Sequence, residues 1–119
     1  MILLGSTGSI GVNTLNIARK FNLNVEVLVA GRNIELLNQQ IQEFKPKKVV
    51  IDREQDISKV NHNNVCSGEN AILQAIQESE TSTVVNALVG FLGLKPTLKA
   101  IECGKKIALA NKESLVVAG

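Results

Sequence analysis

The feature that most constrains how this chain folds is a glycine-rich turn close to its start. Residues 2–4 form a short apolar run, and the turn GSTGSIG follows directly at residues 5–11. A helical period then extends from Ser9 to Phe21, and its apolar face contains Ile10, Leu15, Ala18 and Phe21. A buried strand, a tight turn and a helix in direct succession predict the start of a βαβ unit.

The three glycines of this turn have the spacing GxxGxxG, a variant of the dinucleotide-binding fingerprint. Gly5 would permit the tight turn, Gly8 would let a pyrophosphate approach the backbone, and Gly11 would let the helix pack closely on the strand. Amide groups at the helix N-terminus would then face the anion. Three hydroxyl side chains add hydrogen-bond donors: Ser6, Thr7 and Ser9. A Walker-type phosphate loop is excluded because Val12 stands where that motif requires lysine.

The end of the next predicted strand bears on the choice of dinucleotide. The β-branched run at residues 25–30 ends at Gly31, Arg32 and Asn33. NAD-dependent enzymes usually place an acidic residue about 20 residues beyond the glycine turn to bind the ribose 2′-hydroxyl. Arg32 instead offers a planar cation suited to a 2′-phosphate, which favours NADP. An exposed loop arginine followed by an ordinary helix cap is the alternative interpretation.

Strands and helices are predicted to alternate along the rest of the chain. Asn33 should cap a helix with Ile34, Leu37, Ile41 and Phe44 on one face, and Pro46 should close it. Residues 53–70 are expected to be irregular apart from a short strand at 65–66. A last helix should begin at Pro96 and end at Gly104, with Leu98, Ala100 and Ile101 inward. The other expected elements are strands at 49–51, 83–87 and 107–110 and a helix at 71–78.

This order predicts an α/β fold, a Rossmann-like doubly wound parallel sheet in three layers. About five strands are expected, whereas a full dinucleotide-binding fold has six. A further apolar segment begins at Leu115 and the sequence ends at Gly119. We therefore expect a fragment of a longer multidomain chain.

Two further segments should lie beyond the carboxyl ends of strands, where ligands bind in such sheets. Residues 88–93 are apolar and contain Gly90 and Gly93, so they would either border a nicotinamide ring or serve packing alone. Asn111, Lys112 and Glu113 follow the last strand. Lys112 could bind an anionic substrate group, and its two neighbours could bind the cofactor's amide or ribose hydroxyls; a solvated loop is the alternative.

Composition excludes several classes of function. The formal net charge is only +2, and three Phe are the only aromatic residues, so nucleic acid is not an expected partner. No apolar run approaches the ~18 residues of a membrane span, and the start does not resemble a signal peptide. Cys66 and Cys103 fit no metal or redox spacing and are expected to be reduced thiols of a cytoplasmic protein. A lone His62 in a polar loop excludes a multi-histidine metal site.

Several motifs together resemble one enzyme family. LGSTGSIG at 4–11, VAGRN at 29–33, LANKESLV at 109–116 and the stretch at 87–101 are similar in order and spacing to 1-deoxy-D-xylulose 5-phosphate reductoisomerases. The resemblance covers the family's amino-terminal NADPH-binding domain, here residues 1–119, without the catalytic and C-terminal domains. It implies an NADPH-dependent oxidoreductase of the non-mevalonate isoprenoid pathway. The full enzyme rearranges and reduces its phosphorylated ketose to 2-C-methyl-D-erythritol 4-phosphate.

The resemblance also implies roles for individual residues. Those expected to contact NADPH are Thr7, Gly8, Ser9, Ile10, Gly31, Arg32, Asn33, Asn111 and Glu113. Lys112 would contact the substrate. The catalytic residues and the ligands of a Mg or Mn ion would lie outside this chain, so the chain alone should be inactive. The family further implies a homodimer of the full-length protein.

Two alternatives remain open from the sequence. The chain could be the NADP-binding domain of another oxidoreductase, or a dinucleotide-binding module without catalysis. NKES after the last strand favours the reductoisomerase over other oxidoreductases. Short-chain dehydrogenase chemistry is excluded because the chain contains no tyrosine.

Overall fold

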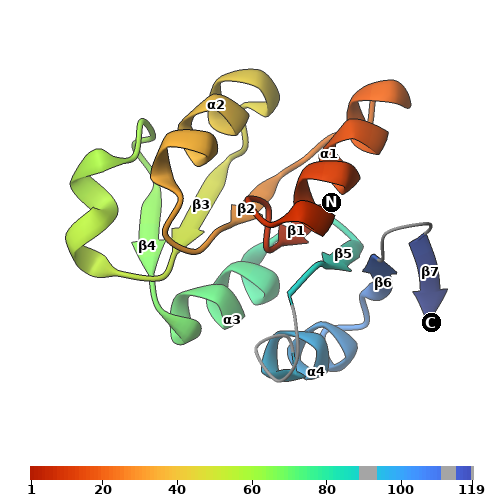
Figure 1. The fold of residues 1–119 in the computed structure, drawn as a ribbon. Coiled ribbons are helices and arrows are strands. Elements are labelled where there is room, and N and C mark those ends of the chain that lie inside the picture. The colour runs from red at the N-terminus through yellow and green to blue at the C-terminus, as the bar shows by residue number, and fades with distance from the viewer. Residues whose placement is uncertain (89–93, 111–114, 119) are drawn as a thin grey trace.

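A computed structural model describes residues 1–88, 94–110 and 115–118 as one seven-stranded sheet with helices on both faces (Figure 1). The strands are β1 (Ile2–Leu4), β2 (Val27–Val29), β3 (Lys48–Ile51), β4 (Val65–Ser67), β5 (Thr83–Asn86), β6 (Lys106–Ala110) and β7 (Leu115–Ala118). The helices are α1 (Ser9–Lys20), α2 (Ile34–Phe44), α3 (Glu69–Glu78) and α4 (Leu94–Glu102), with a 3₁₀ helix η1 (Glu54–Lys59).

The strand order is β4-β3-β2-β1-β5-β6-β7, which confirms the doubly wound fold. From β1 the chain builds outward through β2, β3 and β4, then crosses back to place β5 and β6 on the other side of β1. Six strands are parallel, where about five were expected from the sequence, and β7 pairs antiparallel with β6. The order reverses between β1 and β5, and the carboxyl ends beside that point are where such sheets bind ligands.

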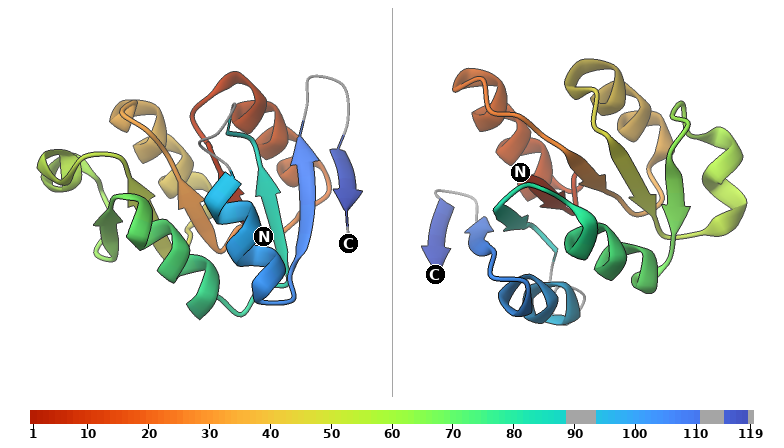
Figure 2. Two further views of the ribbon diagram at one scale, coloured as in Figure 1. Left: turned by 90° about the horizontal axis from the view of Figure 1, so that it is seen from below. Right: turned by 180° about the vertical axis from the view of Figure 1, so that it is seen from behind.

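The core has two parts, one on each face of the sheet. Figure 2 shows the helices that cover these two faces. Leu3 belongs to the cluster under α1 and α2, whereas its neighbours Ile2 and Leu4 belong to the cluster under α3 and α4. All three are fully buried. Burial on both faces explains why the strands read as unbroken apolar runs without alternation.

Local signals set the ends of α2 as predicted. The Asn33 side chain accepts a hydrogen bond from the Leu36 N–H at 3.2 Å, the geometry of an N-cap. Lys45 ends the helix in a left-handed conformation (φ 49°), and Pro46 follows it. These contacts fix the position of the loop between β2 and α2, which contains three of the predicted site residues.

Part of the segment expected to be irregular forms η1 around a buried carboxylate. Asp56 accepts hydrogen bonds from Arg53, with distances of 3.0 Å, and lies 3.5 Å from the Lys59 ammonium. Burial raises the pKa of the Asp56 carboxyl, but the hydrogen bonds and charges of these two cations outweigh burial, and the pKa is lowered overall. The strand that follows η1 confirms the one predicted at 65–66.

Two predictions of buried side chains are wrong. On α4 the buried residues are Pro96 and Ala100, whereas Leu98 and Ile101 are more than half exposed. The face of α4 that contains Ala100 is thus turned inward, and the larger apolar residues lie on the outer side. Phe21 lies one residue beyond α1 and is 63% exposed, because the helix ends at Lys20 before its apolar face reaches that position.

Candidate functional site

The glycine turn is anchored to the carboxyl ends of both strands that flank β1. The N–H groups of Gly5 and Ser6 both donate to the carbonyl of Val29 in β2, at 2.8 and 3.0 Å. On the other side, the Ala87 N–H after β5 donates to the Leu4 carbonyl at 2.9 Å. The turn therefore lies at the point where the strand order reverses.

The first and third glycines are required by backbone contacts. Gly5 has a φ of +86°, and a Cβ there would lie 3.0 Å from the Ala87 carbonyl oxygen. A Cβ on Gly11 would lie only 1.9 Å from the Gly5 oxygen. The first turn of α1 thus crosses the glycine turn at a distance that only glycine permits. A close approach against the strand was expected from the sequence, and the contact is with the residues that directly follow β1.

The second glycine leaves the start of α1 open. Gly8 is the N-cap residue, no side chain caps the helix, and its first turn contains no acidic residue. A Cβ on Gly8 would meet only the Gly5 oxygen, at 3.8 Å. In α2, by contrast, the side chain of Asn33 occupies the equivalent position. The uncapped N–H groups of α1 and its dipole are consequently available to an anionic ligand.

Two adjoining hollows lie at this edge of the sheet. The first, of about 220 Å³, is lined by Gly5, Thr7, Gly8, Ser9, Ile10, Gly31, Ala87 and Leu88. The second, of about 310 Å³, is mainly apolar and is lined by Val29, Ala30, Gly31, Ile51, Asp52, Gly68, Glu69, Ile72, Leu88 and Pro96. Gly31 and Leu88 line both, so the hollows form a continuous surface from the glycine turn to the ends of β2 and β3.

Most of the predicted site residues that the structure describes meet on this surface. Five of the seven line the first hollow: Thr7, Gly8, Ser9, Ile10 and Gly31. Arg32 and Asn33 follow Gly31 directly and are exposed. The predicted residues Asn111, Lys112 and Glu113, with the loop glycines Gly90 and Gly93, lie outside the described residues.

One of the three predicted hydroxyl donors is not accessible. Ser6 is fully buried, so its side chain cannot contact a ligand on the surface of the turn. Its carbonyl accepts a hydrogen bond of 2.8 Å from Nε2 of Gln40, a buried residue of α2. Within the part of the chain described, Oγ of Ser6 and Oε1 of Gln40 have no hydrogen-bond partner. The turn is therefore supported from below by a polar side chain 34 residues away in the sequence.

Sequence reasoning missed two residues of this region, Gln40 and Asp52. Gln40 lies at helical spacing from Leu37 and Phe44, at the margin of the apolar face of α2, which is a weak signal for burial. Asp52 comes directly after β3, so the parallel sheet places it at the same edge as the ends of β1 and β2. Its Oδ2 accepts a hydrogen bond from Nε of Arg32 at 2.9 Å.

The structure also shows the surroundings of His62 and the two cysteines, which were singled out in the sequence. His62 accepts at Nδ1 from the Asn64 N–H at 2.9 Å, and its Nε2 lies 2.7 Å from the Pro46 carbonyl, to which it donates. Cys66 and Cys103 are both free thiols. Among residues 1–88, 94–110 and 115–118, no group of three or more His, Cys, Asp and Glu could hold a metal ion, and no helix could cross a membrane.

Comparison with known proteins assigns this fold and turn to a family. A family model described as 1-deoxy-D-xylulose 5-phosphate reductoisomerase matches residues 1–119. The chain belongs to this family. The reductoisomerases of Nautilia profundicola and Campylobacter hominis are 61% and 56% identical to it over 119 residues. Both matches cover all of this chain but 32% and 33% of the relative, so the chain spans about a third of their length.

Solved reductoisomerase structures share the fold. The enzyme from Zymomonas mobilis in complex with NADPH superposes with a TM-score of 0.81 at 32% identity, over 95% of this chain and 32% of that one. A reductoisomerase in complex with NADPH, fosmidomycin and magnesium gives a TM-score of 0.83, over 95% of this chain and 30% of that one. The family assignment does not favour the two alternatives left open by the sequence.

Proposed function

We propose that residues 1–119 form the NADPH-binding domain of a reductoisomerase. In the full-length protein this enzyme would convert 1-deoxy-D-xylulose 5-phosphate to 2-C-methyl-D-erythritol 4-phosphate. The observation that carries the proposal is the likeness, over 95% of the chain, to a reductoisomerase solved in complex with NADPH. The geometry of the glycine turn supports it independently.

The residues of the site suit the parts of this dinucleotide. The uncapped N-terminus of α1 would bind the pyrophosphate, with hydroxyls from Thr7 and Ser9 beside it. The apolar second hollow would take the adenine ring, next to Gly31. Arg32 at its margin would bind the 2′-phosphate, and Asn33 would combine its capping role with a contact through its free amide group.

The nicotinamide end would be bound from the far side of the switch point. β6 ends at Ala110 at the same edge of the sheet, and the next three residues in the sequence are Asn111, Lys112 and Glu113. We propose that Asn111 and Glu113 contact NADPH and that Lys112 contacts the phosphorylated ketose. When bound, NADPH supplies the hydride. This chain's residues contribute binding and orientation.

The remaining properties are proposed for the full-length protein. Ligands from outside this chain would form the site of a Mg or Mn ion. The chain alone would therefore not turn over substrate. We further propose a homodimer in the cytoplasm, a location with which the two free thiols agree. The phosphorylated ketose is the proposed substrate.

Calorimetric titration with NADPH and NADH tests the cofactor assignment. We expect the protein to bind NADPH more tightly, and Arg32→Ala to reduce that preference by about 10-fold, the value of one charge-assisted interaction with phosphate. Arg32→Lys should keep most of it because the charge remains. Arg19→Ala, which removes an exposed arginine paired with Glu43 near the other end of α1, should change neither affinity. Equal affinity for the two dinucleotides in the unmodified protein would refute the proposal.

A further inference from the structure

The cation expected to recognise the 2′-phosphate already has an anionic partner. Nε of Arg32 donates to Oδ2 of Asp52 at 2.9 Å, and the Asp52 backbone N–H lies 3.5 Å from the Gly31 carbonyl. The two residues follow neighbouring parallel strands whose register pairs Val29 with Val50. The sheet therefore brings them together across 20 residues of sequence.

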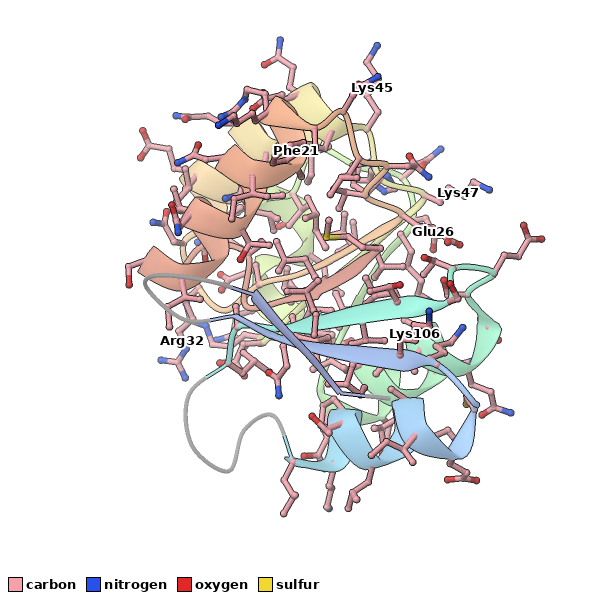
Figure 3. The ribbon with its side chains drawn as sticks, turned by 90° about the vertical axis from the view of Figure 1, so that its right-hand side faces the viewer. Phe21, Glu26, Arg32, Lys45, Lys47 and Lys106 are labelled. Carbon is pink, nitrogen blue, oxygen red and sulfur yellow. The ribbon has the colours of Figure 1, made fainter. Side chains whose placement is uncertain are left out.

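The pairing uses one side of the guanidinium. The described contacts of Arg32 with Asp52 involve Nε, and the two Nη groups at the outer end take no part in them. Figure 3 shows the Arg32 side chain projecting from the body of the protein. The carboxylate of Asp52 thus fixes the plane of the fork at its base, and four N–H donors at its tip remain for a phosphate.

Asp52 also lies on the ligand surface itself. It lines the second hollow together with Gly31, next to the position at which a ribose phosphate would meet Arg32. A 2′-phosphate carries nearly two negative charges, so a carboxylate on the same guanidinium repels it. In NAD-specific sites an acidic residue at the end of the second strand favours the 2′-hydroxyl. Here the acidic residue comes from the end of the third.

We propose that Asp52 is a further specificity-determining residue, which orients Arg32 through Nε while its charge limits the preference for NADPH over NADH. This inference rests on the proposed function, since it assumes that the dinucleotide binds at the glycine turn. The side chains of Arg32 and Asp52 are 65% and 53% exposed, so their ion pair contributes little to folding. Substitutions at Asp52 can therefore be compared in a folded protein.

Two substitutions separate the orienting role from the charge. Asp52→Asn keeps an oxygen that can accept from Nε and removes the charge, whereas Asp52→Ala removes both. In titrations at low salt, we expect Asp52→Asn to tighten NADPH binding about threefold and to leave NADH binding unchanged. Asp52→Ala should increase the affinity for NADPH less than Asp52→Asn does, because no side chain then holds the Arg32 guanidinium through Nε. The gain in Asp52→Asn should shrink as salt is raised.

Glu43→Gln is the matched control. It removes an exposed carboxylate that is also paired with an arginine, and it changes the net charge by the same amount, but it lies away from the site. We expect it to leave both affinities unchanged. The inference is overturned if Asp52→Asn weakens NADPH binding, or shifts NADPH and NADH equally, or if Glu43→Gln has the same effect. If the unmodified protein does not prefer NADPH, the proposed function fails first and the inference falls with it.

Discussion

Gly11→Ala tests the close approach of α1 to the glycine turn. The added Cβ would lie 1.9 Å from the Gly5 oxygen and 2.8 Å from the carbonyl carbons of Gly5 and Ser6. All three are backbone atoms, so no side chain can rotate away to relieve the contact. The start of α1 must therefore move by about 1 Å before the contact becomes tolerable in a close-packed interior.

That displacement would disturb the hydrogen bonds that hold the turn. Gly5 and Ser6 both donate to Val29, and Gln40 donates to the Ser6 carbonyl from below. Overpacking of this kind costs typically 1–3 kcal/mol, and a rigid backbone contact places it at the upper end, so we expect a loss of about 2–4 kcal/mol. For a domain of this size, the midpoint of thermal unfolding should fall by roughly 10–15 °C.

Gly8→Ala is the matched substitution, three residues away in the same turn. Its Cβ would meet only one atom, at 3.8 Å, and the φ of −77° suits alanine. The free energy of unfolding should therefore change by less than about 1 kcal/mol. Its methyl group would instead enter the first hollow and weaken NADPH binding by about tenfold. Urea unfolding followed by circular dichroism measures stability, because the chain has no Trp or Tyr for fluorescence. Equal stability of the two variants would refute this reasoning.

Three other predictions concern the support of the site and the core, and urea unfolding checks each. Gln40→Leu should lower the free energy of unfolding by about 1–2 kcal/mol, because the buried Ser6 carbonyl loses its hydrogen-bond donor. An unchanged midpoint of urea unfolding would contradict that hydrogen bond. Asp56 has a lowered pKa, so its contribution is present above the unfolded pKa of about 3.9 and is lost as pH falls through the folded pKa. Asp56→Asn should therefore be less stable at pH 7 and decline less steeply in acid, whereas parallel profiles would exclude this role. Leu98→Ser should change stability by under about 0.5 kcal/mol, and Ala100→Leu should cost about 1–3 kcal/mol; the reverse order would mean that α4 is turned over.

The sheet could be predicted because its signals are local. An unbroken apolar run marks a strand buried on both faces, and the turn after β1 requires glycine at two positions for reasons of contact alone. The N-cap at Asn33 was equally predictable, since a capping side chain forms its hydrogen bond within its own turn. The antiparallel direction of β7 was not predictable, because the sequence of an apolar strand does not indicate whether it pairs parallel or antiparallel.

Side-chain orientation on helices was less predictable where the helix is short. The apolar residues of α4 are compatible with more than one buried face, and the sheet selects the one that contains Ala100. Leu98 and Ile101 satisfy the helical period equally well but lie outside. Periodicity identifies which residues share a face of a helix, and the size of the residues then decides which face can approach the sheet closely.

The two residues that sequence reasoning missed at the site were missed for a different reason. Gln40 and Asp52 act on residues 34 and 20 positions away, so no motif of fixed spacing can contain them. The topology nevertheless limits where such partners arise: in a parallel sheet, the first polar residue after each strand emerges at the edge where the ligand binds. Applied to β3, this rule selects Asp52 from the sequence alone. The absence of an acidic residue at the end of β2 is therefore not sufficient to predict the charge around a 2′-phosphate, because a neighbouring strand can supply one.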